Sequence, residues 1–179
     1  MDHASELVLD AAQIDFVCGG VSISAASCRA DGLPSLMRAV GCRVAADRRT
    51  LNVLLAATPG AGVLDDVRQS GAVAVVFSQP STHRTLQIKG RDARVVPPEA
   101  GDAELAARYR DAFVDELRPL GYPEHVIRTV LGWPADDLVV LQFTAHALFV
   151  QTPGPRAGEA LAEGGVGGGA GSAGSGGAR

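Results

Sequence analysis

Cationic and hydroxyl-bearing side chains are the residues of this sequence best suited to hold a ligand. They gather in residues 34–43 and 76–90, and they are Arg38, Arg43, Ser78, Ser81, Thr82, Arg84 and Lys89. A phosphate monoester is bound by several converging donors, and arginine is favoured because its planar guanidinium forms two parallel hydrogen bonds. These residue types therefore predict a site for a phosphorylated small molecule.

Other kinds of catalytic site lack their sequence signals. No G-x-S-x-G motif marks a nucleophilic serine, and the four histidines are scattered without the spacing of metal ligands. Gly19 and Gly20 are not followed by the glycine pattern of a dinucleotide-binding loop. A hydrolase, a metal centre and a Rossmann enzyme are therefore not expected.

The strands that position these side chains are predicted from alternation and turn residues. Residues 17–26 alternate and are rich in β-branched residues, and Asp31-Gly32 after them is a turn signal. With residues 35–45 as the returning strand, these signals predict a β-hairpin. Further strands are expected over residues 51–57, 73–78, 85–96 and 138–150. Ser81, Thr82 and Arg84 then lie in the polar connection between two strands.

Helices are expected beside the sheet. Apolar residues at helical spacing predict them after Ser5, from Pro59 to Gly71, over residues 103–120 and after Pro123. The turns between strands are mostly too short for parallel crossovers, so the sheet should be mainly antiparallel and able to close into a barrel.

One domain is expected up to residue 155. The chain has 179 residues, of which 46% are hydrophobic and 20% charged, as is usual for globular proteins. Residues 156–179 are rich in glycine, alanine and serine and have little to bury, so they are expected to form a disordered tail.

Charge and cysteine content narrow the expected partners. The net charge of -4 provides no positive field for a nucleic acid. The three cysteines form no C-x-x-C pair and are typical of reduced thiols. No run of eighteen apolar residues and no secretory pattern occurs, so we expect a cytoplasmic protein that binds neither nucleic acid nor membrane.

Two segments resemble the pyridoxamine 5'-phosphate oxidase-like, FMN-binding split-barrel superfamily. PSLMRAVGCR, residues 34–43, looks like the family's second-strand pattern, with Arg38 and Arg43 in the places of two basic residues that bracket the FMN. VFSQPSTHRTLQIKG, residues 76–90, is similar to the strand, loop and strand that hold the cofactor's phosphate and ribityl chain. Ser78, Arg84 and Gln87 match best there.

The resemblance implies an α+β, mainly β fold: an antiparallel split β-barrel of about six strands with flanking helices. It implies FMN as cofactor, in a groove between the two subunits of a homodimer, and oxidoreductase activity on a small-molecule redox substrate. The implied cofactor-binding residues are Arg38, Arg43, Ser78, Ser81, Thr82, Arg84, Gln87 and Lys89. The segment by which vitamin B6 oxidases hold their substrate has no counterpart after Val150, so that reaction is not implied.

Several alternatives stay open. Each cation taken singly fits a solvated strand charge that discourages edge pairing. Strand alternation puts Arg38 and Arg43 on opposite faces unless a bulge near Gly41 resets the phase. The same fold could hold a deazaflavin, or haem or another tetrapyrrole with His83 or His146 as axial ligand. It could also be a non-catalytic dimeric scaffold.

Overall fold

The computed structural model describes residues 7–29 and 31–163, which form two antiparallel sheets around a shared core. The strands are β1 (Ser22–Cys28), β2 (Pro34–Arg38), β3 (Gly41–Val44), β4 (Thr50–Ala56), β5 (Val73–Ser78), β6 (Thr85–Gly90), β7 (Arg94–Val96), β8 (Leu138–Thr144), β9 (Ala147–Val150) and β10 (Ala160–Glu163). The helices are α1 (Ala11–Val17), α2 (Ala61–Ser70), α3 (Asp102–Leu117) and α4 (Glu124–Val130), with 3₁₀ turns at Arg118–Leu120 and Ala135–Asp137.

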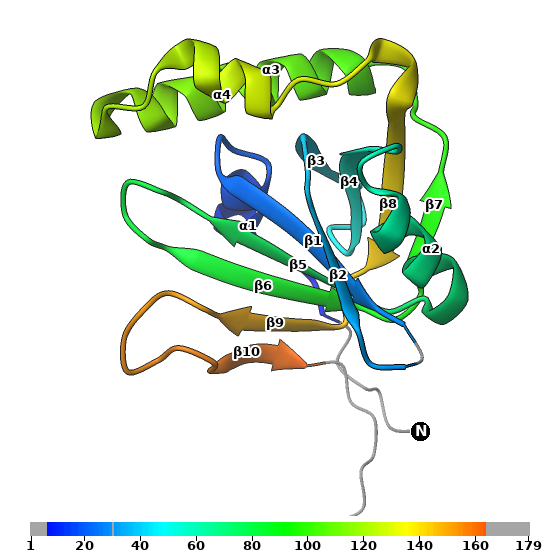
Figure 1. Ribbon diagram of the computed structural model, residues 1–179. Helices are drawn as coiled ribbons and strands as arrows, with labels where there is room; N and C mark the ends of the chain where they lie inside the picture. The colour runs from blue at the N-terminus through cyan, green and yellow to red at the C-terminus, as the bar shows by residue number, and fades with distance from the viewer. Residues whose placement is uncertain (1–6, 30, 164–179) are drawn as a thin grey trace, which may run out of the picture.

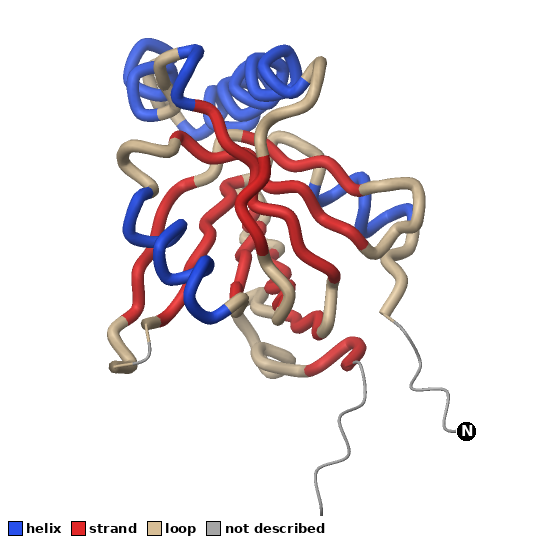
Figure 2. Tube along the Cα trace, turned by 90° about the vertical axis from the view of Figure 1, so that its right-hand side faces the viewer, coloured by secondary structure: helices blue, strands red, loops and turns tan. Residues whose placement is uncertain are grey.

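The first sheet has the strand order β10-β9-β6-β5-β1-β2 and the second has the order β3-β4-β8-β7. Figure 1 shows α3 and α4 lying across one end of the strands, and Figure 2 shows the same layer of helices from the side. The mainly antiparallel β architecture expected from the sequence is confirmed. None of the described helices is both long enough and apolar enough to cross a membrane.

Three of the expected strands are each divided between the two sheets. The stretch 35–45 becomes β2 and β3, the stretch 85–96 becomes β6 and β7, and the stretch 138–150 becomes β8 and β9. At the first crossing residues 39–42 are all buried, so the stretch 35–45 shows no polar interruption where it passes between the sheets. With β10 added, the six expected strands become ten.

The start of α1 and the end of the fold differ from expectation. Asp10 caps α1, because its carboxylate accepts a hydrogen bond from the Gln13 backbone N–H at 2.8 Å while the Gln13 side chain accepts one from the Asp10 N–H. The expected cap, Ser5, lies outside the described residues. At the other end β10 pairs with β9, so the ordered fold reaches Glu163, and residues 164–179 lie outside the described residues.

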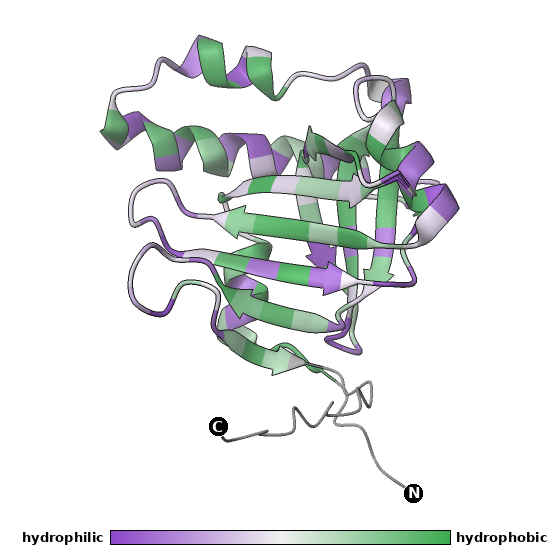
Figure 3. Ribbon diagram, turned by 60° about the horizontal axis from the view of Figure 1, so that its bottom comes forward, coloured by the Kyte–Doolittle hydropathy of each residue, from purple (hydrophilic) through white to green (hydrophobic). Residues whose placement is uncertain are grey.

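The other helices agree closely with the sequence patterns. Val63, Leu64 and Val67 of α2 are buried, and Gly71 ends that helix in the left-handed conformation, with φ of 65°. The helices carry alternating hydrophobic and hydrophilic colours in Figure 3, as the apolar stripe of residues 103–120 predicts for α3. The apolar side of α3 is buried against the barrel. In α4 Ile127 is buried, whereas Val126 and Val130 are 43% and 62% exposed.

Helix α3 sits directly on the start of β1. The Tyr109 hydroxyl donates a hydrogen bond to the Val21 carbonyl at 2.7 Å. A Cβ atom added to Gly20 would lie 2.6 Å from the backbone carbon and oxygen of Ala112. Only a residue without a side chain allows this approach.

We expect Gly20→Ala to lower the free energy of unfolding by about 1–3 kcal/mol, because the new methyl group meets helix backbone that cannot rotate away. Urea denaturation measures the change. Gly62→Ala in α2 is the matched control, because its Cβ would have only an ordinary contact at 3.7 Å, with Ser35, and should stabilise by about 0.5–1 kcal/mol. Equal effects of the two substitutions would contradict the close approach of α3.

Candidate functional site

The structure separates the eight predicted cofactor-binding residues into three places. Four lie on the outer face of the first sheet, three lie in the turn between β5 and β6, and one lies on the second sheet. In that order they are Arg38, Ser78, Gln87 and Lys89; then Ser81, Thr82 and Arg84; and finally Arg43.

The four residues of the outer face are assigned by strand register. Directly paired residues of neighbouring strands project from the same face. Ser24 pairs with both Arg38 and Val76, and Val76 pairs with Gln87. These side chains alternate with the buried residues of the core, so they point away from it.

Ser78 and Lys89 lie on the same face, in the two rows that flank the row of Val76 and Gln87. Ala74 pairs with Lys89 one row along, and Ser78 lies two residues after Val76 on β5. The Ser78 hydroxyl is 2.8 Å from the hydroxyl of Thr85. The outer face therefore carries Arg38 together with three residues from a later part of the sequence.

Arg43 is held away from this face by two carboxylates. Its Nε lies 2.8 Å from Oδ1 of Asp102, and its Nη2 lies 3.0 Å from Oε2 of Glu99. The Asp102 side chain is only 3% exposed, and its hydrogen bond raises the pKa of Arg43. The chain crosses between sheets after Arg38, so the two arginines lie on different sheets. Arg43 thus fastens the start of α3 to β3.

The turn between β5 and β6 already holds an anion of the protein itself. Glu116 of α3 accepts hydrogen bonds from the Ser81 backbone N–H at 2.9 Å and from the Gln79 amide at 3.4 Å. Burial raises the pKa of Glu116, but these hydrogen bonds outweigh that effect and its pKa lies below the ordinary value. The Glu116 carboxylate therefore occupies hydrogen-bond donors of the turn that was predicted to bind a phosphate.

The other side chains of this turn also have partners within the protein. The Thr82 hydroxyl donates to the Gln79 side-chain oxygen at 3.0 Å. The Arg84 guanidinium lies 4.2 Å from the centre of the Phe16 ring, a cation–π contact. Sequence reasoning missed Glu116 because it lies 35 residues from Ser81 and is one of several acidic residues on α3.

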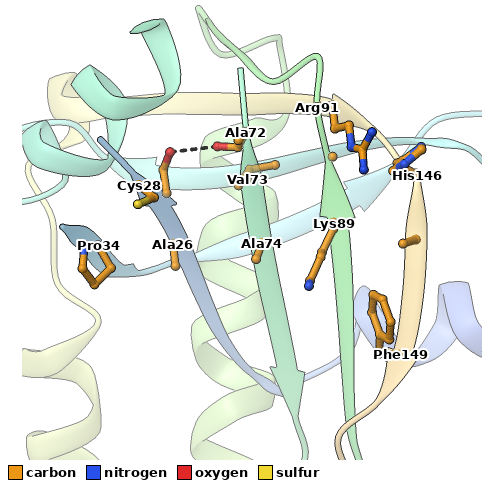
Figure 4. A pocket seen from close by; sticks show the side chains of 13 residues that line it. Ala26, Cys28, Pro34, Ala72, Val73, Ala74, Lys89, Arg91, His146 and Phe149 are labelled. Carbon is orange, nitrogen blue, oxygen red and sulfur yellow. Dashed lines mark hydrogen bonds between the residues drawn. The ribbon is translucent and has the colours of Figure 1, made fainter. Parts of the chain in front are cut away.

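A cavity of about 660 Å³ opens on the outer face of the first sheet, over strands β1, β5, β6 and β9. Figure 4 shows Cys28 and Pro34 on one side of it and Arg91, His146 and Phe149 on the other. Alanines and Gly90 contribute much of the lining, so little side-chain bulk fills the space. The cavity offers a flat apolar surface beside polar groups.

The charge of this cavity is one-sided. None of its thirteen lining residues is acidic, although the whole chain has a net charge of -4. Within the described ranges Lys89 and Arg91 form no ion pair, in contrast to Arg43. The Lys89 ammonium lies 4.7 Å from the centre of the Phe149 ring. The cavity can therefore accept an anionic ligand without displacing an internal carboxylate.

Lys89 is the predicted site residue that lines this cavity, and sequence reasoning missed its neighbours. Arg91 could have been predicted from the sequence, because it lies two positions after Lys89 and strand alternation places both side chains on the same face. His146 gave no such signal, because it is brought in by a crossing between sheets: its backbone N–H donates to the Lys89 carbonyl at 2.8 Å.

No protein-family model matches the sequence, and no curated protein matches it. Among solved structures, HupZ from Group A Streptococcus is similar with a TM-score of 0.51 and 14% identity, over 84% of this chain and 100% of that one. An F420 reductase has a TM-score of 0.48 and 15% identity, over 75% of this chain and 93% of that chain.

A pyridoxamine 5'-phosphate oxidase-related, FMN binding protein from Nostoc punctiforme has a TM-score of 0.42 and 14% identity, over 76% of this chain and 77% of that chain. The two antiparallel sheets, joined by strand runs that pass from one sheet to the other, form a split β-barrel. The split-barrel fold that the sequence resemblance implied is thus confirmed. At these identities the likeness concerns the fold alone.

Glu116→Gln should lower stability at neutral pH, and this deficit should shrink as the pH falls below about 4.3. The folded pKa of Glu116 is depressed, so its contribution is present above the unfolded pKa of about 4.3 and is lost as the pH falls through the folded value. Because Glu116 is only half-buried, we expect at most about 1 kcal/mol.

Urea midpoints at pH 7 and pH 3 provide the measurement. Asp115→Asn is the control, because its ion pair with Arg118 is on the surface and should contribute little at either pH. A deficit of Glu116→Gln that does not shrink between pH 7 and pH 3 would show that the charge of Glu116 is not what holds the turn.

Proposed function

We propose that this split barrel binds FMN in the cavity of its outer face and is an FMN-dependent oxidoreductase. The observation that carries the proposal is an apolar surface of small residues beside two cations, with no carboxylate among the lining residues. The volume of about 660 Å³ lies within the range of roughly 300–1,000 Å³ that is usual for cofactor sites.

Lys89 and Arg91 would hold the phosphate of the cofactor. A phosphate monoester carries about -1.5 to -2 charges at neutral pH, which two cations without carboxylate partners can balance. Arg91 supplies a planar fork for two phosphate oxygens, and Lys89 supplies a compact point charge. His146, beside them in the cavity wall, is a third possible donor.

The ring system would lie against Ala26, Ala74 and Phe149, which offer apolar surface to a planar aromatic ligand. When bound, FMN supplies hydride or electron transfer, and the protein supplies binding, orientation and exclusion of water. Arg38 and Gln87, on the next row of the same face, could reach polar atoms of the cofactor.

The other predicted residues have different roles in this proposal. Arg43 is neutralised by Asp102 and Glu99, and the β5–β6 turn of Ser81, Thr82 and Arg84 is closed by Glu116 and Phe16. These residues would support the fold rather than contact the phosphate. We further propose a cytoplasmic location, which suits three free cysteines.

We also propose that the protein is a homodimer whose second copy covers the cavity. The outer face of the first sheet carries Leu36, which is 71% exposed and pairs with Ala26 of the cavity. A two-fold axis would place the same face of both subunits together and bury these residues. The cofactor would then lie in a groove between subunits, open to a small-molecule redox substrate.

A tetrapyrrole is the second candidate ligand, favoured by the position of His146 in the cavity wall. Its imidazole could serve as an axial ligand of haem, with the two cations near the carboxylates of the macrocycle. Absorbance and mass spectrometry of the protein as purified distinguish the candidates. A flavin spectrum with the mass of FMN supports the proposal. A deazaflavin, a Soret band that His146→Ala abolishes, or a colourless protein that FMN does not saturate would overturn it.

Lys89→Ala and Arg91→Ala should each weaken FMN about ten- to a hundredfold and leave riboflavin nearly unchanged. Removal of one charge-assisted donor from a phosphate costs roughly 1.5–3 kcal/mol, and riboflavin has no phosphate to lose. Quenching of flavin fluorescence on titration of the apo-protein gives both dissociation constants.

Two arginine variants serve as controls for this titration. Arg94 bonds Gln142 on the second sheet, and Arg84 covers Phe16, so Arg94→Ala and Arg84→Ala should leave the ratio of FMN to riboflavin affinity unchanged. If Arg84→Ala shifts this ratio and Lys89→Ala and Arg91→Ala do not, the phosphate binds at the β5–β6 turn instead.

Leu36→Asp should convert a dimer into a monomer of 18.4 kDa, because a carboxylate would be buried without a partner in the proposed interface. Light scattering at micromolar concentration measures the mass. Leu120→Asp is the control, since Leu120 is 45% exposed in the 3₁₀ turn after α3, away from this face. A wild-type protein that is already monomeric with FMN present would remove the shared groove.

A further inference from the structure

Two of the three cysteines meet at a second cavity, which the flavin proposal does not use. This cavity of about 340 Å³ is lined by Cys18, at the end of α1, and by Cys42 of β3. Arg43 and Arg108 contribute to the same wall. The two thiols are 24 positions apart in the sequence and are brought together by the packing of α1 against β3.

The two thiols differ in access and in ionisation. Cys18 is exposed, whereas Cys42 is 3% exposed and its sulfur lies 3.9 Å from the Arg43 carbonyl oxygen. Hydrogen bonding between the two side chains lowers the pKa of Cys18 and raises that of Cys42. Cys18 is therefore the thiol that ionises first and meets solutes, and Cys42 lies behind it as a protonated thiol.

We propose that Cys18 and Cys42 form a reversible disulfide when the protein meets a hydroperoxide. The Cys18 thiolate attacks one oxygen of the hydroperoxide, the O–O bond breaks, and Cys18 becomes a sulfenic acid. The other oxygen leaves and takes up one proton; when the oxidant is hydrogen peroxide, it leaves as water. The Cys42 sulfur then attacks the Cys18 sulfur, the S–S bond forms and a second water leaves. Two electrons pass from the thiols to the peroxide.

The surroundings favour this pairing over the third cysteine. Cys28 is exposed at the other cavity, where its thiol contacts only the carbonyl of its neighbour Arg29, at 3.4 Å. Within the described ranges it has no second thiol to resolve a sulfenic acid. The new bond would tie α1 to β3 next to Arg43, whose ion pair with Asp102 anchors α3. Transient, redox-sensing disulfides of this kind occur in reducing compartments.

The test uses the full-length Cys28→Ser protein, because trypsin leaves Cys18 and Cys28 together in the peptide of residues 1–29. After treatment with hydrogen peroxide, both remaining thiols should resist alkylation and the intact mass should fall by two hydrogen atoms. A linked pair of peptides, residues 1–29 and 39–43, should appear and should vanish on treatment with dithiothreitol.

Two further variants assign the roles. Cys18→Ser should abolish the linked peptides and, because Cys18 is exposed, should leave the fold intact. Cys42→Ser should leave a sulfenic acid on Cys18 that dimedone traps, an adduct that Cys28→Ser protein lacks. Absence of the linked peptides in peroxide-treated Cys28→Ser protein, or dimedone labelling of Cys42 in place of Cys18, would overturn the proposal. Neither measurement depends on flavin binding.

Discussion

The three crossings between sheets separate some basic residues of this split barrel and bring others together. At each crossing the chain leaves one sheet and enters the other without an intervening helix: from β2 to β3, from β6 to β7 and from β8 to β9. The first crossing separates Arg38 from Arg43, although they are five positions apart. The other two bring Arg91 and His146 to the same cavity, where the His146 N–H bonds the Lys89 carbonyl. The cationic side of the cavity is thus a product of the corners of the barrel.

The position of carboxylates, rather than the number of cations, decides which basic residues of this chain are neutralised within the protein. Asp102 and Glu99 neutralise Arg43, and Glu116 occupies the donors of the β5–β6 turn. Lys89 and Arg91 have no such partner in the described part of the chain. A chain with net negative charge therefore keeps one local surface on which an anion meets no competing carboxylate.

Local sequence signals predicted most helices and strands. They could not predict which side chains from different strands meet at one site. The run of residues 73–78 matches β5, and Gly71 ends α2 as expected, because both signals are contained within a few residues. The pairing of Arg43 with Asp102 spans 59 positions, and the sharing of one face by Arg38 and Gln87 depends on the register of three strand pairs. Neither can be read from alternation within single strands. β10 was missed because its four residues lie in a segment whose composition resembles a linker.

Glu116 has a consequence for selectivity beyond its structural role. A carboxylate tethered to the same chain competes for the donors of the β5–β6 turn at an effective concentration of at least the order of millimolar. A free anion would have to displace this intramolecular ligand before it could bind Ser81 or Gln79. The Glu116 carboxylate thereby occupies these donors ahead of inorganic phosphate and other small anions of the surrounding solution.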